Sequence, residues 1–174
     1  MASVGHVIVG MCAARVVCAT ASRREWLLSL VAFAAVAMLP DADVIAFMLR
    51  IPYAAPWGHR GASHSLLLAL LVGLGIGGGL GWLRGQLGRY LVASVLVLAS
   101  HGLLDTLTDG GLGVALLWPW SKVRFFAPVR PIPVAPIGLG MLSERGLSVL
   151  LTETLYFLPL LLLALWPRTR ATRG

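Results

Sequence analysis

The stretch YLVASVLVLASHGLLDTLT, residues 90–108, decides the fold of this chain. It is almost entirely apolar over its first half, and its length is close to the roughly 20 residues that a tilted membrane-spanning helix needs. Two ionisable residues, His101 and Asp105, nevertheless lie inside it. Because a bilayer penalises each unpartnered ionisable group by several kcal/mol, these two residues predict a transmembrane helix that carries a functional polar site.

The composition places the whole chain in the membrane class. Hydrophobic residues make up 58% of its 174 residues and charged residues only 12%, about half of the share in a soluble domain. A net charge of +7 is compatible with nucleic-acid binding, but in a membrane protein it more often reflects contact with anionic headgroups. We therefore expect one integral membrane domain over residues 1–174, with no cleavable signal and no nucleic-acid partner.

Five apolar segments predict an all-α integral membrane bundle of about five transmembrane helices. Pro40 is expected to end or kink the second of them. In the third, Gly73, Gly77 and Gly81 form a smooth stripe that packs either within the monomer or between copies, so an oligomer is one option. The segments are residues 4–21, 26–39 with an extension to 49, 64–83, 90–108 and 147–166.

The positions of the arginines predict the orientation of the bundle. With five crossings, three arginine-containing stretches lie on one side, which the positive-inside rule makes cytoplasmic. Other cations lie on the opposite side, which suggests that they have a role beyond topology. We therefore expect a multi-pass membrane protein with the three arginine-containing stretches in the cytoplasm. The arginines on the cytoplasmic side are Arg23, Arg24, Arg84, Arg89, Arg168, Arg170 and Arg173.

Polar residues from four segments are predicted to lie at similar depths. At a rise of 1.5 Å per residue, His6 lies about 25 Å above the cytoplasmic end of its segment, Asp41 about 22 Å, His64 about 28 Å, His101 about 17 Å and Asp105 about 22 Å. These groups should therefore meet in the outer half of the bilayer. Imidazole and carboxylate together are typical ligands of divalent metals, so we expect a buried polar metal site facing the extracytoplasmic side.

Local spacing agrees with a shared site. His101 and Asp105 are four residues apart, which places them on one face of a helix. Asp41 and Asp43 would diverge in a regular helix, but a break at Pro40 would let both carboxylates turn inward.

The short turn HRGASHS, residues 59–65, brings two further histidines into the third segment. His59 and His64 flank it, and either Ser63 or Ser65 is expected to cap the helix that follows. Arg60 would then lie beside the metals, where an anionic substrate oxygen would be stabilised.

Simpler interpretations remain open for single residues. A lone intramembrane histidine is more often a hydrogen-bonded core residue than a ligand. Asp109, in the sequence TDGG, fits ordinary turn chemistry. Glu153 either pairs with an arginine or serves as a general base.

Taken together, the motifs resemble the YdjM-like family of inner-membrane metal-dependent hydrolases. The matching pieces are GHVIVG at 5–10, LPDADV at 39–44, GHRGASHSLL at 58–67 and ASHGLLDTLTDGG at 99–111. Arg60, Ser65, Thr108 and Glu144 match recurrent positions, whereas Asp109 stands where relatives often have proline. The resemblance implies as metal ligands His6, Asp41, Asp43, His59, His64, His101 and Asp105.

A more distant similarity to zinc phospholipase C and related zinc nucleases suggests a reaction class by analogy only. Seven ligands suit two or three ions, most simply Zn²⁺, with Mn²⁺ or Mg²⁺ as alternatives. The expected reaction is hydrolysis of a phosphoester in a membrane lipid or lipid-linked headgroup. Asp43 or Asp109 would take the proton. Cations expected to hold the phosphate are Arg60, Lys122, Arg124 and Arg130.

Three rival functions remain at this point. A zinc amidase or esterase acting on an acyl lipid would use one metal and fewer ligands. A nuclease would need an accessible groove, which burial of the site disfavours. A transporter could use the same residues for ion or proton passage, but it needs access from both sides of the membrane. The aromatic residues Trp118, Trp120, Phe125 and Phe126 are expected to form a rim that admits a lipid sideways.

Overall fold

The computed structural model describes residues 3–18 and 22–166, and within them the regular structure is helical. The α-helices are α1 Ser3–Val17, α2 Arg23–Met38, α3 Ile45–Met48, α4 Leu66–Arg84, α5 Leu87–Asp105 and α6 Glu144–Leu165. Short 3₁₀ helices are η1 Pro40–Val44, η2 Ala62–His64 and η3 Gly138–Leu142. Isolated β-bridges join Thr108 to Ile132 and Val114 to Phe125. The predicted all-α class is confirmed.

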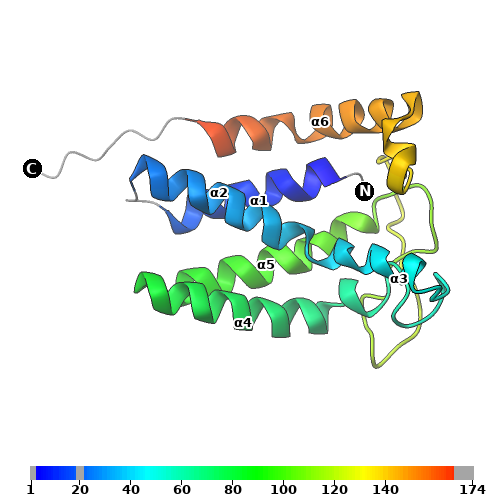
Figure 1. The fold of residues 1–174 in the computed structure, drawn as a ribbon, viewed down its shortest axis with the longest axis horizontal. Helices are drawn as coiled ribbons and strands as arrows, with labels where there is room; N and C mark the ends of the chain where they lie inside the picture. Colours follow the sequence, from blue (N-terminus) through cyan, green and yellow to red (C-terminus); the bar gives the residue numbers. More distant parts are fainter. Residues whose placement is uncertain (1–2, 19–21, 167–174) are drawn as a thin grey trace, which may run out of the picture.

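The long helices lie side by side along the longest axis of the molecule (Figure 1). Helix α1 packs against α2, α5 and α6, and α4 packs mainly against α5. The start of α1, the end of α5, the starts of α4 and α6, and the short helix α3 all lie at one end of the bundle (Figure 1). This end, together with the loop between α5 and α6, is called the loop end below.

The helices fit a membrane protein, although not all of them are long enough to span a bilayer alone. By length and composition α4, α5 and α6 qualify, and α2 with residues 40–48 qualifies as a fourth span bent by 43°. Helix α1 has 15 residues and is shorter than the roughly 20 that a span needs. Each of the five predicted apolar segments contains a helix, and three or four of them meet the criteria for a span. Residues 19–21 of the first segment lie outside the described part of the chain.

The bend between α2 and η1 occurs at Pro40, as predicted. Helix α2 begins with a capping box, in which Ser22 and Glu25 bond reciprocally to each other's backbone amides, and ends at Met38. Of the two serines considered as caps of α4, Ser65 is the one that accepts a hydrogen bond from the amide of Leu68.

The glycine stripe packs within the chain. A β-carbon on Gly73, Gly77 or Gly81 would lie within 3 Å of backbone atoms of α5, so each of these glycines allows α4 and α5 to approach closely. The suggestion that this stripe joins two copies is therefore wrong, because its surface is already buried against α5. Gly85 has φ of 63° and ends α4 in the left-handed conformation that favours glycine.

The end opposite the loop end carries the arginines used to predict orientation. Arg23 begins α2, Arg84 ends α4, and Arg89 lies in the first turn of α5. Arg84 forms an exposed ion pair of 3.4 Å with Glu25, which links two of the three predicted cytoplasmic stretches. The third stretch, with Arg168, Arg170 and Arg173, lies outside the described residues.

Candidate metal centre

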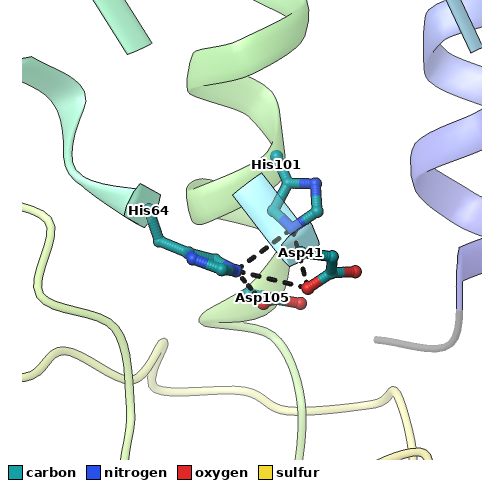
Figure 2. A group of neighbouring side chains, drawn as sticks. All are labelled: Asp41, His64, His101 and Asp105. Carbon is teal, nitrogen blue, oxygen red and sulfur yellow. Dashed lines mark hydrogen bonds and ion pairs between the residues drawn. The ribbon is translucent and has the colours of Figure 1, made fainter. Parts of the chain in front are cut away.

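Four side chains from three parts of the chain form a compact buried cluster at the loop end (Figure 2). Asp41 comes from η1, His64 from η2, and His101 and Asp105 from one face of α5. The Nε2 atoms of His64 and His101 lie 3.2 Å apart. Asp41 Oδ1 lies 3.5 Å from His64 Nε2 and 3.4 Å from His101 Nε2. Asp105 Oδ2 lies 3.4 Å from His64 Nε2.

These separations match the edges of a coordination tetrahedron. With Zn–N and Zn–O distances of about 2.0–2.1 Å, two ligand atoms of a tetrahedral site lie about 3.3–3.4 Å apart. The four measured separations in the cluster, from 3.2 to 3.5 Å, fall around this value. The residues therefore fit a divalent metal ion in number, chemical type and spacing.

The outer hydrogen bonds of both histidines also favour a cation. His101 Nδ1 lies 2.6 Å from the carbonyl oxygen of Ala37, and His64 Nδ1 lies 3.1 Å from Asp43 Oδ2. When each Nδ1 carries the proton and donates it, each Nε2 presents a lone pair to the cluster. Two lone pairs and two carboxylate oxygens then converge, an arrangement that a bound cation stabilises.

A second group of candidate ligands shares Asp41 with the first and adds Asp43 and His59. Asp43 Oδ1 lies 2.6 Å from His59 Nδ1, and its Oδ2 accepts hydrogen bonds from the Arg60 amide and the Ser63 hydroxyl. Sequence reasoning considered Ser63 only as a helix cap and therefore missed this contact.

Both carboxylates of PDAD reach the centre because the backbone is 3₁₀ at this point. Residues two apart project about 120° from each other in a 3₁₀ helix, compared with about 160° in an α-helix. The break at Pro40 thus lets Asp41 and Asp43 face one region.

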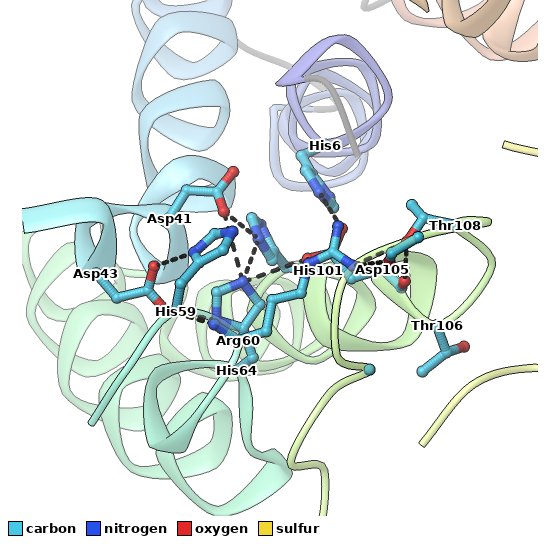
Figure 3. Close-up of polar contacts among 12 residues, drawn as sticks. His6, Asp41, Asp43, His59, Arg60, His64, His101, Asp105, Thr106 and Thr108 are labelled. Atoms are coloured by element: carbon cyan, nitrogen blue, oxygen red, sulfur yellow. Dashed lines mark hydrogen bonds and ion pairs between the residues drawn. The ribbon is translucent and has the colours of Figure 1, made fainter. Parts of the chain in front are cut away.

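His6 lies at the edge of the first group (Figure 3). Its ring stacks on that of His101 with 3.6 Å between centroids, and its Nε2 lies 3.3 Å from Asp105 Oδ1. Neither ring nitrogen makes an aligned hydrogen bond within the described residues, although the side chain is buried. His6 thus contacts the oxygen of Asp105 that faces away from His64, and it lies outside both groups of candidate ligands.

Arg60 is buried among the acidic residues. Its Nε lies 3.2 Å from Asp105 Oδ2, and its Nη1 donates to Thr108 Oγ1 at 2.9 Å and to the Gly110 carbonyl at 3.2 Å. Thr108 in turn donates to the Asp105 carbonyl. The guanidinium therefore holds Asp105 and the start of the following loop in place, and it offsets part of the negative charge of the centre.

The other three cations expected at the phosphate make no ion pair with the candidate ligands among the contacts of the described residues. Arg124 is a structural residue, because its two terminal nitrogens donate to five backbone carbonyls at 2.9–3.3 Å. Lys122 is exposed, and Arg130 is exposed and lies over the ring of Phe126 at 4.9 Å. Lys122, Arg124 and Arg130 do not line the cavity described below, and their role in holding a phosphate stays a prediction.

Three acidic residues of open role also lie outside both groups of candidate ligands. Asp109 is exposed, and its Oδ1 accepts a hydrogen bond of 2.7 Å from the amide of Val134. It anchors a loop and lies outside both groups of candidate ligands, and its role as proton acceptor stays a prediction. Glu153 is buried in α6 and accepts a hydrogen bond from the amide of Gly5. Glu144 is exposed in the first turn of α6.

A cavity of about 400 Å³ lies beside the centre. Asp41, His59, Arg60 and Tyr53 supply its polar lining, and burial raises the pKa of the Tyr53 phenol, which therefore keeps its proton. No motif in the sequence pointed to Tyr53. A larger apolar groove, of about 690 Å³, lies between α1 and α5, but none of the candidate ligands lines it.

The aromatic residues expected to form the rim do not line this cavity. Trp118 packs against Trp57 with ring centroids 5.3 Å apart, and Phe125 pairs with Val114 in a β-bridge. Trp120 is exposed. The apolar lining of the cavity comes instead from Met38 and Val44, beside the bend of the helix pair, and from residues 134–141.

The chain is similar to known proteins of the bacterial inner membrane. A family described as YdjM inner membrane protein matches residues 1–171. Inner membrane protein YbcI of Escherichia coli (strain K12) is 45% identical over 139 residues, which cover 77% of this chain and 80% of that protein. No solved structure matches the chain.

Proposed function

We propose that this chain, which belongs to the YdjM family of inner membrane proteins, is a metal-dependent hydrolase that cleaves a phosphoester of a membrane lipid or a lipid-linked headgroup. The observation that carries the proposal is the cluster of Asp41, His64, His101 and Asp105 next to a cavity, in which four of the six ligand-atom separations are 3.2–3.5 Å. A cluster that served only stability would not need a cavity beside it.

The residues of the site would have three roles: to bind metal ions, to orient the histidines and to fix Asp105. Asp41, His64, His101 and Asp105 would hold one ion, and Asp43 and His59 would share Asp41 to hold a second. The ions, most simply Zn²⁺, supply Lewis-acid polarisation of the phosphoryl oxygen and a water of lowered pKa. The Ala37 carbonyl and Asp43 orient the two central histidines, and Arg60 fixes Asp105.

The number of candidate metal ligands favours a phosphoester substrate over the amide or carboxylic ester of the rival hydrolases. An amidase or esterase with one ion would leave Asp43 and His59 without a role as ligands, whereas two ions suit in-line attack at phosphorus. A transporter needs access from both sides, but the elements that carry the cluster, η1, η2 and the end of α5, lie at the loop end of the bundle (Figure 1). The cavity is lined by residues of the bent helix pair near η1 and of the loops at the same end. These observations support the hydrolase.

The orientation proposed here follows from the distribution of charge. Arg23, Arg84 and Arg89 lie at the end opposite the candidate metal centre, and such residues stay preferentially in the cytoplasm. A multi-pass arrangement with the centre toward the extracytoplasmic side would satisfy this rule. The substrate would then come from the outer leaflet of the inner membrane.

Metal analysis of the purified full-length protein tests the proposal. We expect about two zinc ions per chain and hydrolysis of a phospholipid phosphoester. Replacing His101 or Asp105 with Ala should remove metal and activity together. The matched control is Ser100→Ala, because Ser100 neighbours His101 but its hydroxyl bonds to the Val97 carbonyl of its own helix and it belongs to neither group of candidate ligands.

Two outcomes would refute the proposal. One is a wild-type protein that is free of metal yet fully stable, which would favour a transporter or a structural role. The other is a His101→Ala or Asp105→Ala protein, folded by its thermal melt in detergent, that retains its full metal content.

A further inference from the structure

The cavity beside the candidate metal centre is lined by two kinds of side chain. The polar ones are those of Asp41, His59, Arg60 and Tyr53. The apolar ones are called the apolar wall below. They come from Met38, Val44, residues 134–137 and Met141. A ligand that fills the cavity would therefore meet both charged and apolar side chains.

The apolar wall is only partly covered by the protein itself. Val44 is 43% exposed and Ile137 is 53% exposed, although both line the cavity. Leu139 and Leu142, on the same short helix η3, are 86% and 85% exposed. Exposed apolar side chains beside a cavity are stabilised when a hydrocarbon group covers them.

The two halves of the apolar wall come from different parts of the fold. Met38 and Val44 belong to the bent helix pair that qualifies as a membrane span. Residues 134–141 belong to the loop that follows α5, and they are tied to it by the bond from the Val134 amide to Asp109 and by the bridge from Thr108 to Ile132. A hydrocarbon chain bound on the apolar wall would thus lie between the bent helix pair and a loop that is anchored to the end of α5.

We propose that the apolar wall binds the hydrocarbon chain of the substrate, so that the enzyme selects long-chain lipid phosphoesters over short or water-soluble ones. This inference rests on the proposed hydrolase function. The phosphoester lies at the polar residues, and the chain leaves the cavity past Val44 and Ile137. Specificity is set by Ile137 and Met141, and Asp109 is a positioning residue that holds the wall against the centre.

A series of alkyl 4-nitrophenyl phosphodiesters, from ethyl to decyl, tests the inference on the purified full-length protein. Each methylene that becomes buried on the wall should raise kcat/KM about fourfold until the chain extends beyond the wall. Replacing Ile137 with Ser should flatten this dependence, so that kcat/KM of the decyl substrate falls toward kcat/KM of the ethyl substrate. The matched control is Leu139→Ser, because Leu139 lies two residues away but does not line the cavity.

Binding of the corresponding alkylphosphonates, measured by calorimetry, separates this inference from the proposed reaction. If affinity rises with chain length in the wild type and in Leu139→Ser but not in Ile137→Ser, the apolar wall is supported even when no phosphodiester is hydrolysed. If the protein hydrolyses phosphodiesters with the same kcat/KM at every chain length, the hydrolase stands and the apolar wall is refuted. The apolar wall is also refuted if Ile137→Ser and Leu139→Ser show the same dependence on the chain length of the substrate.

Discussion

Arg60 is a buried cation whose bonds connect Asp105, Thr108 and the Gly110 carbonyl. Removing one member of a buried ion pair leaves its partner uncompensated and costs about 3–5 kcal/mol. Arg60→Ala should therefore lower the thermal stability strongly in detergent and reduce metal content, because Asp105 loses the group that fixes it. Arg60→Lys should restore part of the stability, since it keeps the charge but not the forked geometry.

Arg130→Ala is the matched control for the Arg60 variants. Arg130 is exposed and its guanidinium lies over Phe126, a contact worth about 0.5–1 kcal/mol at a surface. A loss of stability in Arg130→Ala as large as in Arg60→Ala would contradict the assignment of Arg60 to the centre.

Two substitutions of Asp109 distinguish a positioning role from a role as proton acceptor. Asn keeps an oxygen that accepts the Val134 amide, whereas Ala does not. Asp109→Asn should therefore retain activity and stability, and Asp109→Ala should lose about 1 kcal/mol and weaken the preference for long-chain substrates. Measured kcat/KM values across the alkyl series check this. Inactive Asp109→Asn protein that still binds metal would restore Asp109 as the base.

At the scale of elements, the pairing of α4 with α5 depends on close approach. A β-carbon at Gly77 would lie 2.5 Å from the Tyr90 carbonyl oxygen, so Gly77→Ala should separate the helices and lower the melting temperature. Gly79 lies on the same helix with open space around it, so Gly79→Ala should be neutral or stabilise the helix by about 0.5–1 kcal/mol. Similar melting temperatures in the two variants would contradict the packing described here.

The centre itself is built at the ends of elements. Asp41 and Asp43 lie in η1, His64 ends η2, and Asp105 is the last residue of α5. Only His101 lies well inside a helix, one turn before the end of α5. Positions near helix ends let donor atoms from separate segments approach one point, which regular helices packed along their lengths would keep apart.

At the scale of the whole molecule, the orientation in the membrane can be measured directly. In a background with Cys12→Ala and Cys18→Ala, Leu139→Cys reports on the loop end and Gln86→Cys on the arginine-rich end. We expect a membrane-impermeant maleimide to label Leu139→Cys in intact spheroplasts and Gln86→Cys only after lysis. The reverse pattern would place the candidate metal centre on the cytoplasmic side.

Sequence reasoning predicted much of this arrangement because its signals are local. Apolar length identifies helices, Pro40 marks a bend, and a spacing of four residues places His101 and Asp105 on one face. Depth counted along each helix also indicated that His64 and Asp41 approach these residues, and the structure brings them together.

The amino-acid sequence by itself determined the helical membrane class, the bend and the residues available as metal ligands, since these depend on composition and short-range spacing. Only the tertiary structure decided which side chains share a site. It buried the glycine stripe inside the chain, turned Arg124 and Asp109 to backbone groups, and placed residues 134–141 beside the centre. Such contacts join residues far apart in the chain, and the path of a long loop depends on packing that no local pattern records.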